Sequence, residues 1–222
     1  VGSEMCIRDR NINGGVVNIT GNLRQNNSTV ILNEGALRVD GDYRIQDITT
    51  NSTTGKQEYT YSYGTLKMLY DKDIVSVGGN FTTQSYQSHS SYLTAGTMEV
   101  KGDFTQISKN VNDNKFRCSG NHKLILNGTG NQKISIDDYY STINYLEVEN
   151  SASRKIEMTG NVSINRLDTD LVAATNNLSL YSIDVNGKTL TLNGDVVFYS
   201  GTQNINCLLY TSDAADDLIG VD

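Results

Sequence analysis

The sequence predicts an all-β fold, a right-handed parallel β-helix (β-solenoid) with coils of about 20 residues. Three observations predict it: a nine-residue pattern recurs, apolar and polar residues alternate within each copy, and the composition is typical of short strands joined by polar turns. The chain has 222 residues, with 20 Gly, no Pro and no Trp. No segment shows sustained helical periodicity.

The repeat aligns without gaps in four segments, and a fifth fits the same frame. These segments are GVVNITGNL (15–23), GALRVDGDY (35–43), DIVSVGGNF (73–81), GTMEVKGDF (96–104) and KTLTLNGDV (188–196). Positions three, five and nine are apolar, position seven is Gly, and position eight is Asn or Asp. Because side chains alternate along a strand, positions three and five share one face, which we expect to be the core. A Gln follows soon after the first four copies, at Gln25, Gln46, Gln84 and Gln106.

The Gly-Asn or Gly-Asp step predicts a sharp turn after each strand. We expect the turn glycines to adopt positive φ; they are Gly21, Gly41, Gly79, Gly102 and Gly194. The intervals between Gly21, Gly41, Gly79 and Gly102 are 20, 38 and 23 residues, so the middle interval is close to two repeats. Stacked coils would bury the apolar face that one coil leaves open. The alternative is a β-sandwich or a stack of antiparallel hairpins, which alternation alone does not separate from a solenoid.

The two ends of the chain do not follow this pattern. Val1–Arg10 and Cys207–Ser212 can both be encoded by one DNA segment read from opposite strands. That segment resembles the transposase end of a sequencing-library adapter. We therefore expect residues 1–10 and 207–222 to be adapter-derived, and residues 11–206 to be a β-solenoid fragment. Without these ends, Lys plus Arg falls from 18 to 16 and Asp plus Glu from 25 to 19, so the net charge changes from −7 to −3.

Several function classes lack their sequence signatures. A near-neutral chain without basic clusters argues against nucleic-acid binding, and no apolar run is long enough to span a bilayer. Cys118 is the one Cys within residues 11–206, which excludes a disulfide framework or a Cys-based metal site there. His89 and His122 lack partners at metal-ligand spacing, and we expect them in solvent or in turns. Zinc-protease, nucleophile-elbow, phosphate-loop and dinucleotide motifs are absent.

Paired carboxylates are the one enzymatic feature to test, because β-helices can host polysaccharide-cleaving enzymes. Asp137 and Asp138 are adjacent, so in an extended strand they would point to opposite faces and would not serve one site. Within the repeat, Asp interchanges with Asn at position eight. This interchange favours turn hydrogen bonding over acid–base chemistry. We therefore predict no enzymatic activity, no cofactor and no metal site.

Two Tyr-rich stretches interrupt the repeat, GKQEYTYSYG (55–64) and TTQSYQSHSSYLT (82–94). Insertions in a solenoid map to loops, often on its binding side. The predicted ligand-contact residues are therefore Tyr59, Tyr61, Tyr63, Tyr86 and Tyr92, which could form a flat amphipathic surface for a glycan or a protein. The alternative is that the first three form one face of an ordinary strand.

Residues 64–106 and, with gaps, 119–164 resemble the repeat region of very large secreted or surface proteins of anaerobic gut-type bacteria. Such regions are similar to right-handed parallel β-helices of adhesin or stalk type. The resemblance implies a structural or adhesive segment at the cell surface or outside the cell. Its expected partner is a glycan, the cell wall or a host surface protein, with no nucleic acid and no membrane insertion. The alternatives are a non-catalytic part of a carbohydrate-active β-helix enzyme and a phage tail-fibre segment.

Overall fold

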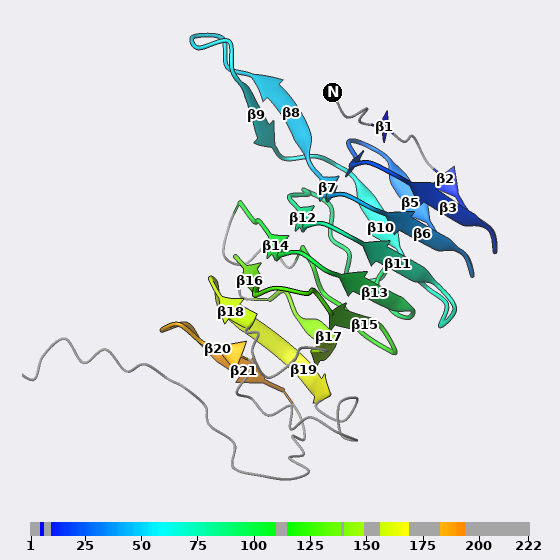
Figure 1. Ribbon diagram of the computed structural model, residues 1–222, viewed down its shortest axis with the longest axis vertical. Helices are drawn as coiled ribbons and strands as arrows, with labels where there is room; N and C mark the ends of the chain where they lie inside the picture. The colour runs from blue at the N-terminus through cyan, green and yellow to red at the C-terminus, as the bar shows by residue number, and fades with distance from the viewer. Residues whose placement is uncertain are drawn as a thin grey trace, which may run out of the picture.

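The computed structural model describes residues 5–6, 10–109, 115–138, 140–148, 156–168 and 183–193. These residues form strands and no helix, in two eight-stranded sheets, one three-stranded sheet and one hairpin (Figure 1). Sheet A holds, in spatial order, β1 (Met5–Cys6), β4 (Leu23–Arg24), β7 (Tyr43–Ile45), β12 (Phe81–Thr83), β14 (Phe104–Gln106), β16 (Gln132–Ile136), β18 (Ile156–Met158) and β20 (Ile183–Asp184). Sheet B holds β2 (Arg10–Asn11), β5 (Thr29–Ile31) and β10 (Thr65–Lys67). Sheet C holds β3 (Val16–Ile19), β6 (Ala36–Val39), β11 (Ile74–Val77), β13 (Thr97–Val100), β15 (Lys123–Leu126), β17 (Ile143–Val148), β19 (Val162–Asp168) and β21 (Leu190–Leu192).

All pairings inside sheets A, B and C are parallel. The chain passes from β4 in sheet A to β5 in sheet B and β6 in sheet C, and then returns to sheet A at β7. We call each such passage a coil. The one antiparallel pair among the described strands joins β8 (Asp47–Thr50) to β9 (Gln57–Thr60). The alternative of stacked antiparallel hairpins is therefore wrong for this part of the chain.

Coil length varies more than the turn spacing predicts. In sheet A, Leu23 lies opposite Tyr43, and Tyr43 lies opposite Phe81, although the second of these intervals is nearly twice the first. The long interval is thus one coil rather than two. Its extra residues form the β8–β9 hairpin, which projects from the sheets (Figure 1). The next two coils, from Phe81 to Phe104 and from Phe104 to Ile134, are intermediate in length.

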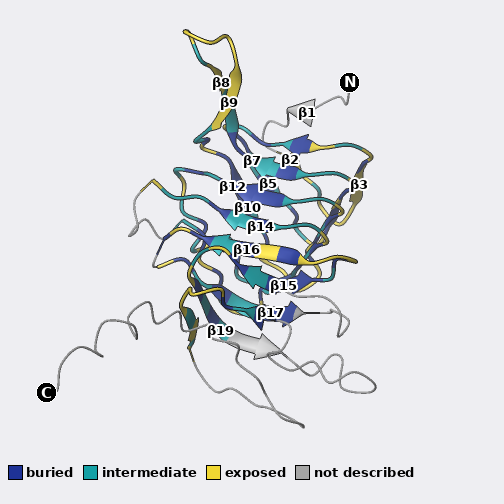
Figure 2. Cartoon of the chain, turned by 60° about the vertical axis from the view of Figure 1, so that its left-hand side comes forward, coloured by how far each residue is buried: buried dark blue, intermediate teal, exposed yellow. Residues whose placement is uncertain are grey.

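The inward positions of the repeat are confirmed. Position three forms a buried column of neighbours in sheet C that contains Leu37, Val75, Met98 and Leu124. Position five forms a second buried column, with Val39, Val77, Val100 and Leu126. Val17, at position three of the first copy, is 37% exposed because β3 is the last strand of sheet C. Figure 2 shows the buried strands within the stack and the exposed tip of the hairpin.

Position nine places large side chains in the core from sheet A. Leu23, Tyr43, Phe81 and Phe104 are fully buried one above another. The ring centroids of Tyr43 and Phe81 are 5.4 Å apart, as are those of Phe81 and Phe104. Contacts between aromatic rings at such distances add about 1 kcal/mol each beyond area burial. The core is thus continuous from one coil to the next.

The fifth copy of the repeat does not lie in these columns. Position three continues from Leu124 to Leu146 and then to Leu167. Leu190, at position three of the fifth copy, instead lies opposite Val162. The fifth copy therefore matches the sequence pattern of the other copies, but its strand is not paired in the same register as theirs.

The turn glycines permit close approach between coils. The backbone N–H groups of Gly41, Gly79 and Gly102 donate to the carbonyls of Gly21, Gly41 and Gly79, at 3.1, 2.9 and 2.9 Å. A Cβ on Gly79 would lie 2.5 Å from Asp42 Oδ1 and 2.8 Å from the carbonyl carbon of Gly41. None of Gly41, Gly79 and Gly102 has φ in the left-handed region, so the expectation of positive φ is wrong for them. Gly194 lies outside the described residues.

A ladder of Asn and Asp side chains runs beside the glycines. Each side chain accepts a hydrogen bond from the backbone N–H one coil on: Asn22 from Asp42, Asp42 from Asn80, Asn80 from Asp103, and Asp103 from Lys133, all at 2.8 Å. Only a carbonyl-type oxygen is needed at this position, which both residue types supply. This shared requirement explains why Asn and Asp interchange at position eight.

Candidate functional site

Three of the five predicted tyrosines form a cluster on the surface. Tyr61 and Tyr63 flank Ser62, which is buried and forms a parallel bridge with buried Ser85 of the next coil. Tyr86 follows Ser85 and therefore lies beside them. Its ring centroid is 4.8 Å from that of Tyr61 and 5.1 Å from that of Tyr63. We call Tyr61, Tyr63 and Tyr86 the tyrosine cluster.

Two lysines border the tyrosine cluster. Lys109 Nζ lies 6.0 Å from the centroid of the Tyr86 ring, and Lys115 Nζ donates to the backbone carbonyl of Tyr86 at 2.7 Å. Tyr63 is 54% exposed, so the cluster presents an aromatic surface to solvent. Such a surface can stack on a sugar ring or an apolar side chain while its hydroxyls form hydrogen bonds.

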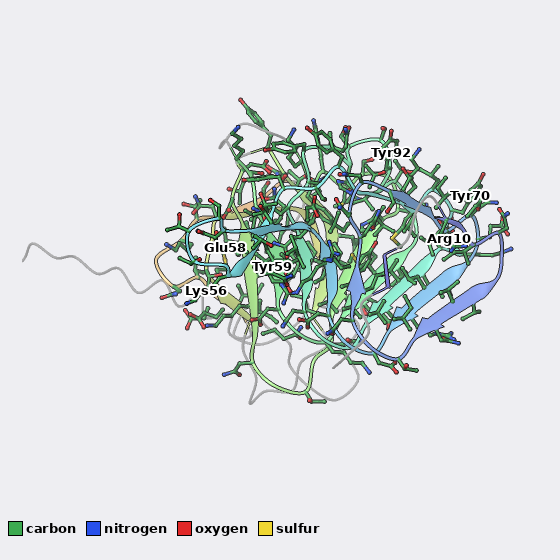
Figure 3. All side chains as sticks on the ribbon, turned by 90° about the horizontal axis from the view of Figure 1, so that it is seen from above. Arg10, Lys56, Glu58, Tyr59, Tyr70 and Tyr92 are labelled. Atoms are coloured by element: carbon green, nitrogen blue, oxygen red, sulfur yellow. The ribbon has the colours of Figure 1, made fainter. Side chains whose placement is uncertain are left out.

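Tyr59 and Tyr92, the other two predicted tyrosines, lie apart from each other (Figure 3). Figure 3 shows Tyr59 beside Lys56 and Glu58, and Tyr92 on the side of the molecule that carries Tyr70. Tyr59 lies on β9, and the guanidinium carbon of Arg44 lies over its ring, 4.9 Å from the centroid of the Tyr59 ring. Lys67 Nζ lies 4.2 Å from the ring centroid of Tyr92. Ring contacts join Tyr61, Tyr63 and Tyr86. Tyr59, Tyr61 and Tyr63 are not one face of a strand, because β9 ends at Thr60.

Both histidines are buried, so the expectation of solvent exposure is wrong. The alternative, turn positions, is confirmed: the N–H of His122 donates to the carbonyl of Ser119 at 3.1 Å, and the N–H of Tyr92 donates to the carbonyl of His89 at 2.9 Å. His89 is 1% exposed and His122 is fully buried. Burial lowers the pKa of His89 to about 4 and that of His122 to about 3. The ring nitrogen Nδ1 of His89 lies 3.1 Å from the carbonyl of Lys115, whereas both ring nitrogens of His122 are buried without a hydrogen-bond partner. Both rings are neutral constituents of the core.

The remaining reactive groups do not assemble a metal site or a nucleophile within the described ranges. No three side chains among His, Cys, Asp and Glu come together there as a bound metal ion would require. Cys118 is buried, and this burial raises the pKa of its thiol. A thiol in that environment is a poor nucleophile, because the thiolate is the reactive form.

A cavity of about 590 Å³ lies where residues 137–138 and 140–142 meet the last two described strands of sheet C. Asp137 and Asp138 both line it, and the expectation that they point to opposite faces held only for an extended strand. They follow β16 rather than belonging to it, and the alternation of a strand does not apply to them. Arg117, Asn161 and Thr191 contribute from other coils.

Sequence reasoning did not find this cavity. Its residues come from several coils and occupy no shared position of the repeat. The one local signal was the Asp137-Asp138 pair. The tyrosine cluster, in contrast, was partly visible in the spacing of Tyr61 and Tyr63.

The described part of the chain includes no helix with the length and apolar character that crossing a bilayer requires. No family model, no curated protein and no solved structure matches the chain.

Proposed function

We propose that this chain is a segment of a right-handed parallel β-helix that serves as a stalk or adhesive surface of an extracellular bacterial protein. The observation that carries the proposal is the unbroken parallel pairing across successive coils. In a stiff rod, each coil must pack strongly against the coils directly before and after it. Stacked coils meet this need because each contacts only its neighbours.

The order of the strands supports a closed helix. Two successive coils pass through sheets A, B and C in the same order: the first contributes β4, β5 and β6, and the second β7, β10 and β11. A chain that returns to the same sheet with parallel strands must turn in one sense throughout. Right-handed crossovers are the strongly preferred sense for parallel strands, and we assign that hand.

Three kinds of contact support a stiff rod. Backbone ladders join the strands of sheets A and C from coil to coil. The Asn and Asp ladder from Asn22 to Asp103 adds a side-chain hydrogen bond at each turn. The aromatic column from Tyr43 to Phe104 joins the interiors of three coils. Bending the rod would disturb all three at once.

The tyrosine cluster is the proposed adhesive element. Its rings come from two adjacent coils, and the β-bridge between buried Ser62 and Ser85 positions them beside each other before any ligand binds. Aromatic residues with few rotatable bonds lose little entropy on binding, and preorganisation raises affinity. The proposed partners are a glycan, the cell wall or a surface protein of a host.

Binding to immobilised glycans, purified peptidoglycan and host surface proteins tests the adhesive role. We expect the intact chain to bind one of these and Tyr63→Ser to weaken binding about tenfold. Tyr70→Ser is the matched control, because Tyr70 is 45% exposed and lies outside the cluster. Equal binding by both variants would remove the cluster from the proposal.

A long sequencing read across the genomic locus tests the location and the stalk role. We expect further copies of the repeat, a secretion signal and a surface anchor in one reading frame with residues 11–206. A flanking catalytic module would instead make this segment the accessory part of an enzyme. An open reading frame without a secretion signal would overturn the extracellular assignment.

A further inference from the structure

We propose that the cavity beside Asp137 is a binding site for a neutral saccharide of about two sugar units, separate from the tyrosine cluster. Its volume of about 590 Å³ falls within the range of small-molecule sites. The inference stands independently of the adhesive role proposed for the tyrosines. It depends on the chemistry of the side chains that line the cavity.

These side chains are those that recognise sugar hydroxyls. Thr191 supplies a hydroxyl, Asn161 an amide and Asp137 a carboxylate. Together they offer both donors and acceptors, as a ligand with many hydroxyl groups requires. Tyr140, which is 49% exposed, adds an aromatic ring that can pack against the apolar face of a sugar.

The lining is held rigidly by contacts between coils. Asn161 Oδ1 accepts the backbone N–H of Thr189 at 2.9 Å, and Asn193 Nδ2 donates to Ser163 Oγ at 2.7 Å. On the other side, Thr142 forms a parallel bridge with Arg117. The site is therefore assembled before a ligand arrives, which reduces the entropy lost on binding.

The two carboxylates have different roles. Asp138 is buried and accepts hydrogen bonds from the backbone N–H and hydroxyl of Ser141, both at 2.5 Å, and from Ser108 Oγ at 2.8 Å. These contacts commit Asp138 to holding Ser141 and Ser108 together. Asp137 is more exposed, and it is the carboxylate that we assign to the ligand.

Charge selects a neutral ligand. Arg117 is the one cation among the described lining residues, which include two carboxylates, Asp137 and Asp138. An acidic sugar or a phosphate would therefore meet net repulsion. Partial burial raises the pKa of Asp137, with a smaller contribution from the charge of Asp138, and this agrees with a site poor in positive charge.

Saturation-transfer NMR and calorimetry with the intact chain test the site. The neutral probes are cellobiose, maltose, lactose and N,N′-diacetylchitobiose, and the acidic probe is digalacturonate. We expect at least one neutral disaccharide to bind and digalacturonate to bind about tenfold more weakly or not at all. Failure of all four neutral probes to bind, or preference for digalacturonate, would overturn the proposal.

Variants locate the bound sugar. Thr191→Val removes a hydroxyl while nearly keeping the side-chain shape, and Tyr140→Ser removes the ring. Each should weaken binding about tenfold. Thr49→Val, on the exposed hairpin, is the matched control for the first and should change nothing. Tyr63→Ser should also leave this binding unchanged, so the result is separable from that for the tyrosine cluster. Binding that survives both cavity variants would place the sugar elsewhere and overturn the assignment.

Discussion

The carboxylate of Asp73 accepts a hydrogen bond from the backbone N–H of Glu34 at 2.6 Å, which joins two successive coils. Its other oxygen accepts the N–H groups of Leu69 at 2.7 Å and Tyr70 at 3.1 Å. Asp73 is fully buried. One side chain thus closes the loop before β11 and fixes that loop against the preceding coil.

Asp73→Ala should lower the free energy of unfolding by about 3 kcal/mol, because three backbone N–H groups would lose a charged, buried acceptor. Asp73→Asn keeps the shape but loses one acceptor, and should cost about half as much. Asp71→Ala, at an exposed site in the same loop, is the control. Urea denaturation measures all three, and equal midpoints for Asp73→Ala and Asp71→Ala would contradict the assigned role.

Val39→Asp tests which face of β6 is inside. Val39 is 2% exposed and lies between Ile19 and Val77 of the neighbouring coils. An unpaired carboxylate there should destabilise the chain by about 4 kcal/mol or more. Arg38→Asp changes the adjacent, outward residue and should cost far less. Urea melts in which the two variants have the same stability would show that the register of sheet C is incorrect.

Gly79→Ala tests the close approach of the turns. The added methyl would lie 2.5 Å from Asp42 Oδ1 and 2.8 Å from the backbone of Gly41, so neighbouring coils would have to separate. We expect a loss of about 2 kcal/mol in thermal or urea unfolding. Gly130→Ala is the matched control, because nothing lies within 4 Å of its Cβ position. If Gly130→Ala lost stability and Gly79→Ala did not, the close approach of the turns at Gly41 and Gly79 would be contradicted.

The buried columns of side chains in sheet C could be predicted from sequence because their signals are local. Alternation placed Val39 and Val77 inside, and the Gly-Asn and Gly-Asp steps marked where strands end. The coil that carries the β8–β9 hairpin could not be predicted. It is nearly as long as two short coils, and chain length alone cannot distinguish an insertion from an additional turn.

The candidate sites depend on packing between coils, which the sequence shows only in part. Tyr61 and Tyr63 share a side because they flank an inward residue, Ser62. That Tyr86 joins them depends on the pairing of Ser62 with Ser85, which no local pattern specifies. The same reason explains why the burial of His122 was missed: its polar side chain predicted solvent, but neighbouring coils enclose it.

Acid should destabilise the chain through its buried histidines. In the unfolded state a His takes up a proton near pH 6.5, whereas in the folded state the pKa of His89 is about 4 and that of His122 about 3. The unfolded state therefore binds more protons below pH 6.5. Stability is fully present above that pH and is lost as the pH falls towards the folded values. The loss at pH 4 should be roughly 3 kcal/mol for each histidine.

His122→Leu isolates this contribution. Leu removes two buried ring nitrogens that have no hydrogen-bond partner, so the variant should lose less stability than the wild type between pH 7 and pH 4. Urea denaturation at a series of pH values measures the difference, and carboxylates that titrate in both proteins cancel in it. His89→Leu should show the same trend to a smaller extent, because burial lowers the pKa of His89 less, to about 4 rather than about 3. If wild type and His122→Leu show parallel pH profiles, His122 is not held neutral in the core.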